Sequence, residues 1–199
     1  MRSRLFFFFC ALIICLNVVI DCEQSAKSET MQLLPFSQID SLIGDEYAIS
    51  QTDKIIRPPI GFSQPNDSIL NEIRQGMTDE QGYGDGKTLI NCFLDTINQA
   101  GFLISKIDGL SLRGDTAAFF GKYRATIHGL YGAENITEAS GWIGSIFIAN
   151  FVISDGTTAR FYAICLDSSE VALELSYFLP ETQLASIIES IHSSVASIK

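Results

Sequence analysis

TARFYAICLDSSEVALELSYFLPETQLASIIESIHSSVASI, residues 158–198, contains two strand patterns followed by one helix pattern. Between Val171 and Tyr177 apolar residues alternate with Glu174 and Ser176, which is typical of a strand with one buried face. Pro180 follows, at a point where a helix can begin. The next apolar residues recur at helical spacing: Leu184, Ile187, Ile188, Ile191, Val195 and Ile198. This run predicts an amphipathic helix that packs its apolar side on a sheet.

The preceding residues predict more strands and one further helix. Alternating or continuous apolar runs indicate strands at 88–95, 102–107, 135–139, 142–153 and 158–166. Turn residues separate them at 96–101, at Ser140-Gly141 and at Asp155-Gly156. A helix should begin at Asp115, bury Phe120, Tyr123, Ile127 and Leu130 on one face, and end at Gly129 or Gly132. Residues 64–86 are rich in Gly, Asn, Asp and Gln and predict a long loop with one helical turn.

This order of elements predicts an α+β fold. Strands joined by short turns pair in an antiparallel sheet, and there is no room for repeated crossover helices between parallel strands. We therefore expect an antiparallel β-sheet flanked by helices, in an α/β/α sandwich.

The N-terminus has the pattern of an export signal. Two arginines precede residues 5–20, LFFFFCALIICLNVVI, which are apolar except for Asn17, and a polar segment follows. The apolar run is shorter than the ~20 residues of a relaxed membrane helix. We expect residues 1–22 to be a signal peptide or an uncleaved N-terminal membrane anchor. The remainder should lie outside the cytoplasm, whether periplasmic, membrane-tethered or secreted.

Cys22 is a candidate lipidation site. Val19-Ile20-Asp21-Cys22 resembles the lipobox of bacterial lipoproteins in its aliphatic positions. Asp21 departs from that pattern, because the position normally holds a small residue. The alternative is that Cys22 is incidental.

Three regions follow from these patterns: residues 1–22, a polar tether at 23–53, and one globular domain at 54–199. The domain contains two cysteines, Cys92 and Cys165, within apolar strand-like runs. In an exported protein such a pair is a candidate disulfide. The alternative is two buried thiols that are not bonded to each other, because unpaired cysteine behaves as a small hydrophobe.

Charge argues against nucleic acid as a partner. Thirteen Lys and Arg against 23 Asp and Glu give a net charge of −10, whereas phosphate binding needs a basic face. The string QGYGDGKT at 81–88 ends like a phosphate-binding loop, but a strand pattern follows it and not a helix. We expect neither a cofactor nor a metal site, since the chain has no HExxH and no Cys-x-x-Cys motif. No Gly-x-Ser-x-Gly motif nominates a catalytic serine.

Trp142 is the only tryptophan, and it lies between Gly141 and Gly144. Its ring is a candidate ligand contact. A core anchor is the alternative interpretation.

Several of these features together resemble a known family. They are Pro58-Pro59-x-Gly61-Phe62, the Gly141-Trp142 pair, the turn at Asp155-Gly156, and the closing VALELSYFLP with its amphipathic helix. Residues 54–199 are similar in this order to the Mog1/PsbP-like superfamily, which includes small exported bacterial proteins. The resemblance implies an antiparallel sheet with helices on its faces and a binding or accessory role. It implies no catalytic residue, because the superfamily has no shared catalytic motif.

We therefore expect an exported binding or accessory protein, without enzyme activity, whose partner is a protein or small ligand of the cell envelope. The alternative is a small exported hydrolase whose site is assembled from residues far apart in the sequence.

Overall fold

The computed structural model describes residues 36–79, 86–107, 116–166 and 172–199. All of them belong to one compact unit, residues 33–199. Asp115 and Val171, which the sequence placed at the start of a helix and of a strand, lie outside the described residues.

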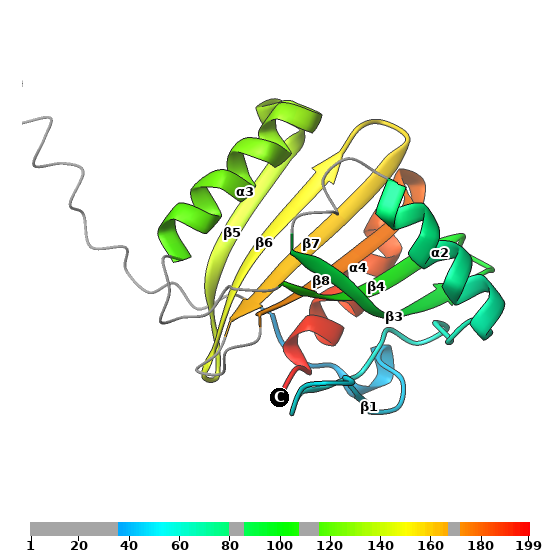
Figure 1. The fold of residues 1–199 in the computed structure, drawn as a ribbon. Helices are drawn as coiled ribbons and strands as arrows, with labels where there is room; N and C mark the ends of the chain where they lie inside the picture. Colours follow the sequence, from blue (N-terminus) through cyan, green and yellow to red (C-terminus); the bar gives the residue numbers. More distant parts are fainter. Residues whose placement is uncertain (1–35, 80–85, 108–115, 167–171) are drawn as a thin grey trace, which may run out of the picture. The chain divides into compact units, whose positions relative to one another are not determined.

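A six-stranded antiparallel sheet forms the centre of this unit, in the order β3-β4-β8-β7-β6-β5 (Figure 1). The strands are β3 (Lys87–Asp95), β4 (Ala100–Ile107), β5 (Ile136–Ile143), β6 (Ile146–Ser154), β7 (Thr158–Leu166) and β8 (Ala172–Pro180). Strands β5 to β8 follow one another as a meander, and β4 pairs with β8 to bring the first hairpin alongside it. The predicted α+β fold with an antiparallel sheet is confirmed.

One predicted turn was placed too early. Ser140 and Gly141 lie inside β5, and the turn to β6 is formed by Gly144 and the residue after it. Gly144 has a φ of +56°, the left-handed conformation that a tight hairpin requires and that glycine adopts without steric cost. Trp142 therefore lies near the end of β5 and does not begin β6.

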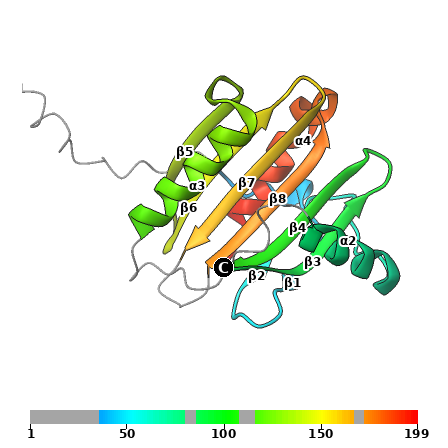
Figure 2. The ribbon, with the colours of Figure 1, turned by 45° about the horizontal axis from the view of Figure 1, so that its top comes forward.

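Three helices of the described ranges pack on the sheet: α2 (Asp67–Asp79), α3 (Thr116–Tyr131) and α4 (Glu181–Ala196). Figures 1 and 2 show α2 and α3 on one face and α4 on the other. Helix α2 corrects the expectation of a long loop at 64–86. Its described side chains are mostly exposed, and its apolar residues are few, Ile69, Leu70 and Ile73, among many polar ones.

The two faces of the sheet carry separate apolar clusters. On one face Phe161 and Tyr177 pack against Ile187, Ile191 and Val195 of α4, as the sequence predicted for this helix. On the other face strands β6, β7 and β8 pack against α3 through a second cluster: Tyr123, Ile127, Phe151, Ile153, Tyr162 and Ile164.

Leu130 was expected on the buried face of α3, but it is 62% exposed. Tyr131 packs against the cluster beneath α3 instead. Gly132, with a φ of +79°, follows the helix where the sequence expected it to end.

The packed part of the chain begins N-terminal to residue 54. Strands β1 (Tyr47–Ala48) and β2 (Ile55–Ile56) pair with each other, and Ile49 belongs to the cluster beneath α4. Phe36 stacks on His192 of α4 at 4.2 Å between ring centroids. Residues 36–53, expected as part of a polar tether, are thus part of the globular unit.

Within the described ranges, no helix has both the length and the apolar run that crossing a bilayer would need.

Candidate functional site

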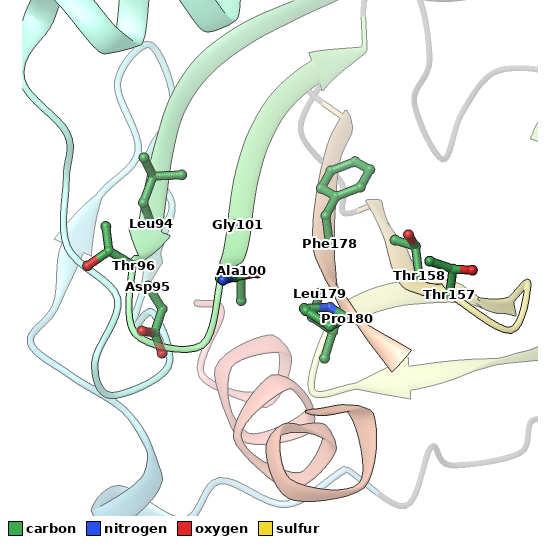
Figure 3. Close-up of a pocket in the computed structure, with 11 residues that line it drawn as sticks. Leu94, Asp95, Thr96, Ala100, Gly101, Thr157, Thr158, Phe178, Leu179 and Pro180 are labelled. Atoms are coloured by element: carbon green, nitrogen blue, oxygen red, sulfur yellow. The ribbon is translucent and has the colours of Figure 1, made fainter. Parts of the chain in front are cut away.

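A hollow of about 700 Å³ opens at the end of the sheet where two hairpins turn (Figure 3). Three segments distant in the sequence border it: the β3–β4 turn, the start of β7, and the last residues of β8 before α4. The hollow is a depression that is open to solvent over most of its extent, and not an enclosed cavity.

The lining is mainly apolar, with polar groups beside it. The apolar residues are Leu94, Ala100, Gly101, Phe178, Leu179 and Pro180. The polar residues are Asp95, Thr96, Gln99, Thr157 and Thr158. Among the described residues, no lysine, arginine or histidine belongs to this lining. Such a surface can bury an apolar group and offer hydroxyl and amide hydrogen bonds at its border.

One row of residues across three strands shapes this hollow. Leu94 of β3 pairs with Gly101 of β4, and Gly101 pairs with Phe178 of β8. Leu94 and Phe178 point to the same side of the sheet in Figure 3. Between them Gly101 contributes no side chain, so the row has a gap at its centre. A Cβ atom added to Gly101 would lie 3.7 Å from Cδ2 of Leu94, an ordinary contact distance.

Asp95 is the one carboxylate in the described lining, and its oxygens are occupied by the turn that it begins. The backbone N–H groups of Ile97 and Asn98 both donate to Oδ1 at 3.0 Å, and the Asn98 side-chain amide donates to Oδ2 at 2.6 Å. Burial raises the pKa of Asp95, but these hydrogen bonds outweigh burial and the pKa lies below its ordinary value. Asp95 is therefore an ionised turn residue at neutral pH and unsuited to act as a general acid.

The β3–β4 turn combines backbone strain with exposed apolar surface. Gln99, in the lining, has a φ of +54°, which is unfavourable for a residue with a side chain. Ile97, at the tip, is 90% exposed. Ile60 is 62% exposed, and the adjacent Gly61 lies so close to this turn that an added Cβ atom would be 3.3 Å from Oδ2 of Asp95. Ile97 and Ile60 thus add exposed apolar side chains near the hairpin end of the sheet.

A second polar cluster lies under α3, away from this hollow. Glu174 of β8 is fully buried, and Lys87 Nζ lies 2.6 Å from its Oε2 atom. Tyr123 donates its hydroxyl to Oε2 at 2.9 Å, and Ser176 donates to Oε1 at 3.0 Å. The lysine ammonium also lies 4.9 Å from the centre of the Tyr123 ring. These contacts tie β3, β8 and α3 together and leave Glu174 no exposed surface for a ligand.

Lys87 is also the lysine of the glycine-rich string at 81–88. Residues 81–85 lie outside the described residues, and Lys87 begins strand β3. A strand and not a helix follows it, as inferred from the sequence.

The candidate disulfide is not formed. Cys92 and Cys165 are both buried thiols. They lie on β3 and β7 with two strands between them, about 14 Å apart at sheet spacing, whereas a disulfide needs Cα atoms within about 7 Å. Cys165 belongs to the cluster beneath α4, and Cys92 points to the opposite face from its neighbour Phe93 in that cluster. The structure therefore agrees with the alternative interpretation, in which Cys92 and Cys165 are two buried thiols that are not bonded to each other.

Trp142 is half-buried and packs edge-on against Phe147 at 5.5 Å between ring centroids. It lies on β5, the opposite edge of the sheet from β3, and is not part of the lining of the hollow. It belongs to neither apolar cluster of the sheet, so both interpretations of its ring stay predictions. Cys22 lies outside the described residues.

The two histidines occupy separate places. His128 Nε2 lies 2.6 Å from Glu138, which Arg124 also contacts at 2.7 Å. Burial lowers the pKa of His192, and the nearby charge of Glu189 acts in the opposite direction. Across the described ranges, no group of three or more His, Cys, Asp or Glu side chains is arranged to hold a metal ion.

Sequence patterns did not reveal the hollow. Leu94, Gly101 and Phe178 are ordinary strand residues, and only the cross-strand register brings them together. One signal was present: Gly101 lies within β4, and a glycine in a strand can mark a close approach by a ligand or another backbone, but the sequence had placed it in the turn at 96–101.

Comparison with known proteins identifies no family. No family model matches the chain. No curated protein matches it either. Among solved structures, it is similar to a protein of Bacteroides thetaiotaomicron VPI-5482 known from a crystal structure at 1.50 Å resolution. The identity is 15% and the TM-score 0.43, over 78% of this chain and 48% of the other. The chain thus spans about half the length of that protein.

Proposed function

We propose that this protein is an exported, non-catalytic binding or accessory protein that uses the hairpin end of its sheet as the binding surface. The observation that carries the proposal is the open, mainly apolar hollow at this end, with the exposed side chain of Ile97 beside it. The signal-like residues 1–22 support export, with Cys22 as the site of lipid attachment in the membrane-held form.

Binding is favoured over hydrolysis by the chemistry of the hollow. A hydrolase needs a general acid or base of suitable pKa at the site of reaction. The carboxylate here is Asp95, whose pKa is lowered and whose oxygens are engaged by its own turn. The remaining polar side chains of the lining are threonines and a glutamine, which suit hydrogen bonding to a ligand.

The resemblance to the Mog1/PsbP-like superfamily supports the same role. The proposal therefore includes kinship with that superfamily's small exported members, which implies accessory work in the cell envelope.

Native mass spectrometry of the protein purified from its source organism tests this function. We expect the wild-type chain to carry a bound small molecule or partner protein. Gly101→Leu, which fills the gap in the row, should no longer carry it. Gly121→Leu is the matched control, because Gly121 on α3 has no atom within 4 Å of an added Cβ. A wild-type chain that emerges bare under gentle conditions, or one whose bound species survives Gly101→Leu, contradicts the proposal.

The same spectra test export and lipidation. A chain beginning at Cys22 with acyl mass would establish the lipoprotein form, and a trimmed chain without it would establish a diffusible one. An unprocessed chain in the cytoplasm would contradict export.

A further inference from the structure

We infer that the hollow at the hairpin end binds an uncharged small molecule with an apolar body, held in the gap between Leu94 and Phe178 above Gly101. This inference rests on the proposed function and names the ligand class of the same site.

The width of the gap favours a single layer of ligand. Leu94 and Phe178 lie on strands that both neighbour β4, so their backbones are about 10 Å apart. Because the intervening residue is Gly101, the space between the two side chains is not filled from within the row. A flat aromatic ring or an alkyl chain inserted there would contact leucine on one side and phenylalanine on the other, as in a protein interior.

The charges around the hollow disfavour an anionic ligand. The lining carboxylate, Asp95, is ionised, and Glu181 follows the lining residue Pro180 at the start of α4. The next residue of the cross-strand row, Arg160, is already engaged: it lies 3.1 Å from Asp155 and 5.0 Å from the Tyr131 ring. An anion would therefore meet negative charge, and the described lining offers it no cation in compensation.

A cationic ligand is disfavoured for a different reason. The oxygens of Asp95 accept three hydrogen bonds from their own turn, so pairing with a ligand would compete with the turn that shapes the site. Burying a charge without a partner is costly. An uncharged head group carries no such cost, and the hydroxyls of the lining residues Thr157 and Thr158 can serve it as hydrogen-bond donors or acceptors.

A matched set of eight-carbon competitors tests the ligand class. The full chain is titrated with the neutral fluorescent probe N-phenyl-1-naphthylamine, and the probe is then displaced with 1-octanol, octanoate or octylammonium at pH 7. We expect saturable binding of the probe and displacement by octanol at concentrations at least about tenfold lower than by either charged competitor. Asp95 repels the carboxylate of octanoate, and its oxygens are already held by the turn that an ammonium group would have to open.

Gly101→Leu should abolish saturable binding of the probe. Gly121→Leu should leave it unchanged, although this variant adds the same apolar side chain to the surface. Circular dichroism and unfolding of each variant establish that it is folded. If Gly101→Leu does not fold, Gly101→Ala is used instead, because its Cβ atom meets Leu94 at an ordinary contact distance. Gly101→Ala should lower the affinity for the probe several-fold.

Two results would overturn the inference. Displacement that is strongest with octanoate or octylammonium assigns the site to a charged ligand. Binding that persists in Gly101→Leu places the probe elsewhere. Either result can coexist with a natural ligand or partner that is lost from Gly101→Leu in native mass spectra, so the ligand class can fail while the proposed function stands.

Discussion

At the scale of single residues, the pairing of Lys87 with Glu174 gives a prediction about stability. Glu174 is fully buried, so removing the lysine leaves a carboxylate without its cation in a site closed to water. Loss of one partner of a buried ion pair typically costs about 3–5 kcal/mol. We expect Lys87→Met to lower the free energy of unfolding by that amount, measured by urea denaturation.

Lys122→Met is the control for this substitution, because Lys122 is exposed on α3, and it should change stability by no more than about 0.5 kcal/mol. Adding Glu174→Gln to Lys87→Met should recover part of the loss, since the amide oxygen can accept from one of the hydroxyls of Tyr123 and Ser176 and the amide N–H can donate to the other. A Lys87→Met protein as stable as Lys122→Met would show that the ion pair contributes nothing.

Gln99 gives a second prediction at this scale. Its φ of +54° is unfavourable by about 1–2 kcal/mol for a side-chain-bearing residue, whereas glycine costs about 0.5–1 kcal/mol in backbone entropy. Gln99→Gly should therefore leave the free energy of unfolding unchanged or raise it by up to about 1 kcal/mol. Thr96→Gly, in the same turn but without a positive φ, should lower it by about 0.5–1 kcal/mol. Equal losses from both glycine substitutions would contradict this explanation.

At the scale of elements, the segment before β1 is coupled to α4 through a histidine. Phe36 stacks on His192, and Ser193 accepts a hydrogen bond from the Ile39 N–H and donates one to the carbonyl of Ser37. Burial lowers the native pKa of His192 below its ordinary 6.5, although Glu189 opposes this. The unfolded chain therefore binds the proton more readily, so this histidine reduces stability as the pH falls below about 6.5.

We expect the urea concentration at the unfolding midpoint of the wild type to be lower at pH 5.5 than at pH 7.5. His192→Phe should make this difference smaller. Phenylalanine keeps a ring for Phe36 to stack on but cannot take up a proton. Glu189→Gln should make this difference larger, because it removes the charge that raises the pKa of His192. An identical pH dependence in wild type and His192→Phe would exclude the histidine as the cause.

Elements whose packing repeats in the sequence could be predicted, and the others could not. Helix α4 buries residues at helical spacing, and it was found from that period. Strand β8 was found from the alternation of apolar residues with Glu174 and Ser176, although the structure buries both faces of β7 and β8. Helix α2 has only a short stripe, Ile69, Leu70 and Ile73, within a segment rich in loop-forming residues, and the composition of that segment outweighed the stripe. The turn at Gly144 was missed because Gly141 offered an equally good local signal, and only the register of β5 against β6 separates them.

At the scale of the whole molecule, the candidate site depends on contacts that no local pattern encodes. Gly101 and Phe178 are neighbours only because β4 pairs with β8, two strands separated in the chain by α3 and three other strands. The buried Glu174 likewise looked like a polar residue on the solvent side of its strand. It is buried because α3 covers that face and brings Tyr123 to it. The place of the candidate site and the burial of Glu174 therefore follow from long-range pairing, which local sequence patterns do not encode.

The two thiols give a prediction about the molecule as a unit, since Cys165 packs beneath α4 and Cys92 faces the other side of the same sheet. Burial also raises the pKa of Cys92, which further suppresses the reactive thiolate. The test uses two variants, one that retains only Cys92 and one that retains only Cys165. In each, the other of these two cysteines is replaced by alanine and the cysteines at positions 10, 15 and 22 by serine. Both variants are labelled with a thiol reagent in dilute urea.

If both faces depend on one cooperative sheet, the two thiols should become reactive with the same opening free energy, equal to that of global unfolding. Their opening energies should also shift together when Lys87→Met is introduced, although the Lys87 ammonium lies on the α3 side. If Cys92 became reactive at a clearly lower free energy than Cys165, the β3 side would open on its own. The sheet would then consist of two units of different stability, and the hollow between β3 and β8 would lie on the boundary between them.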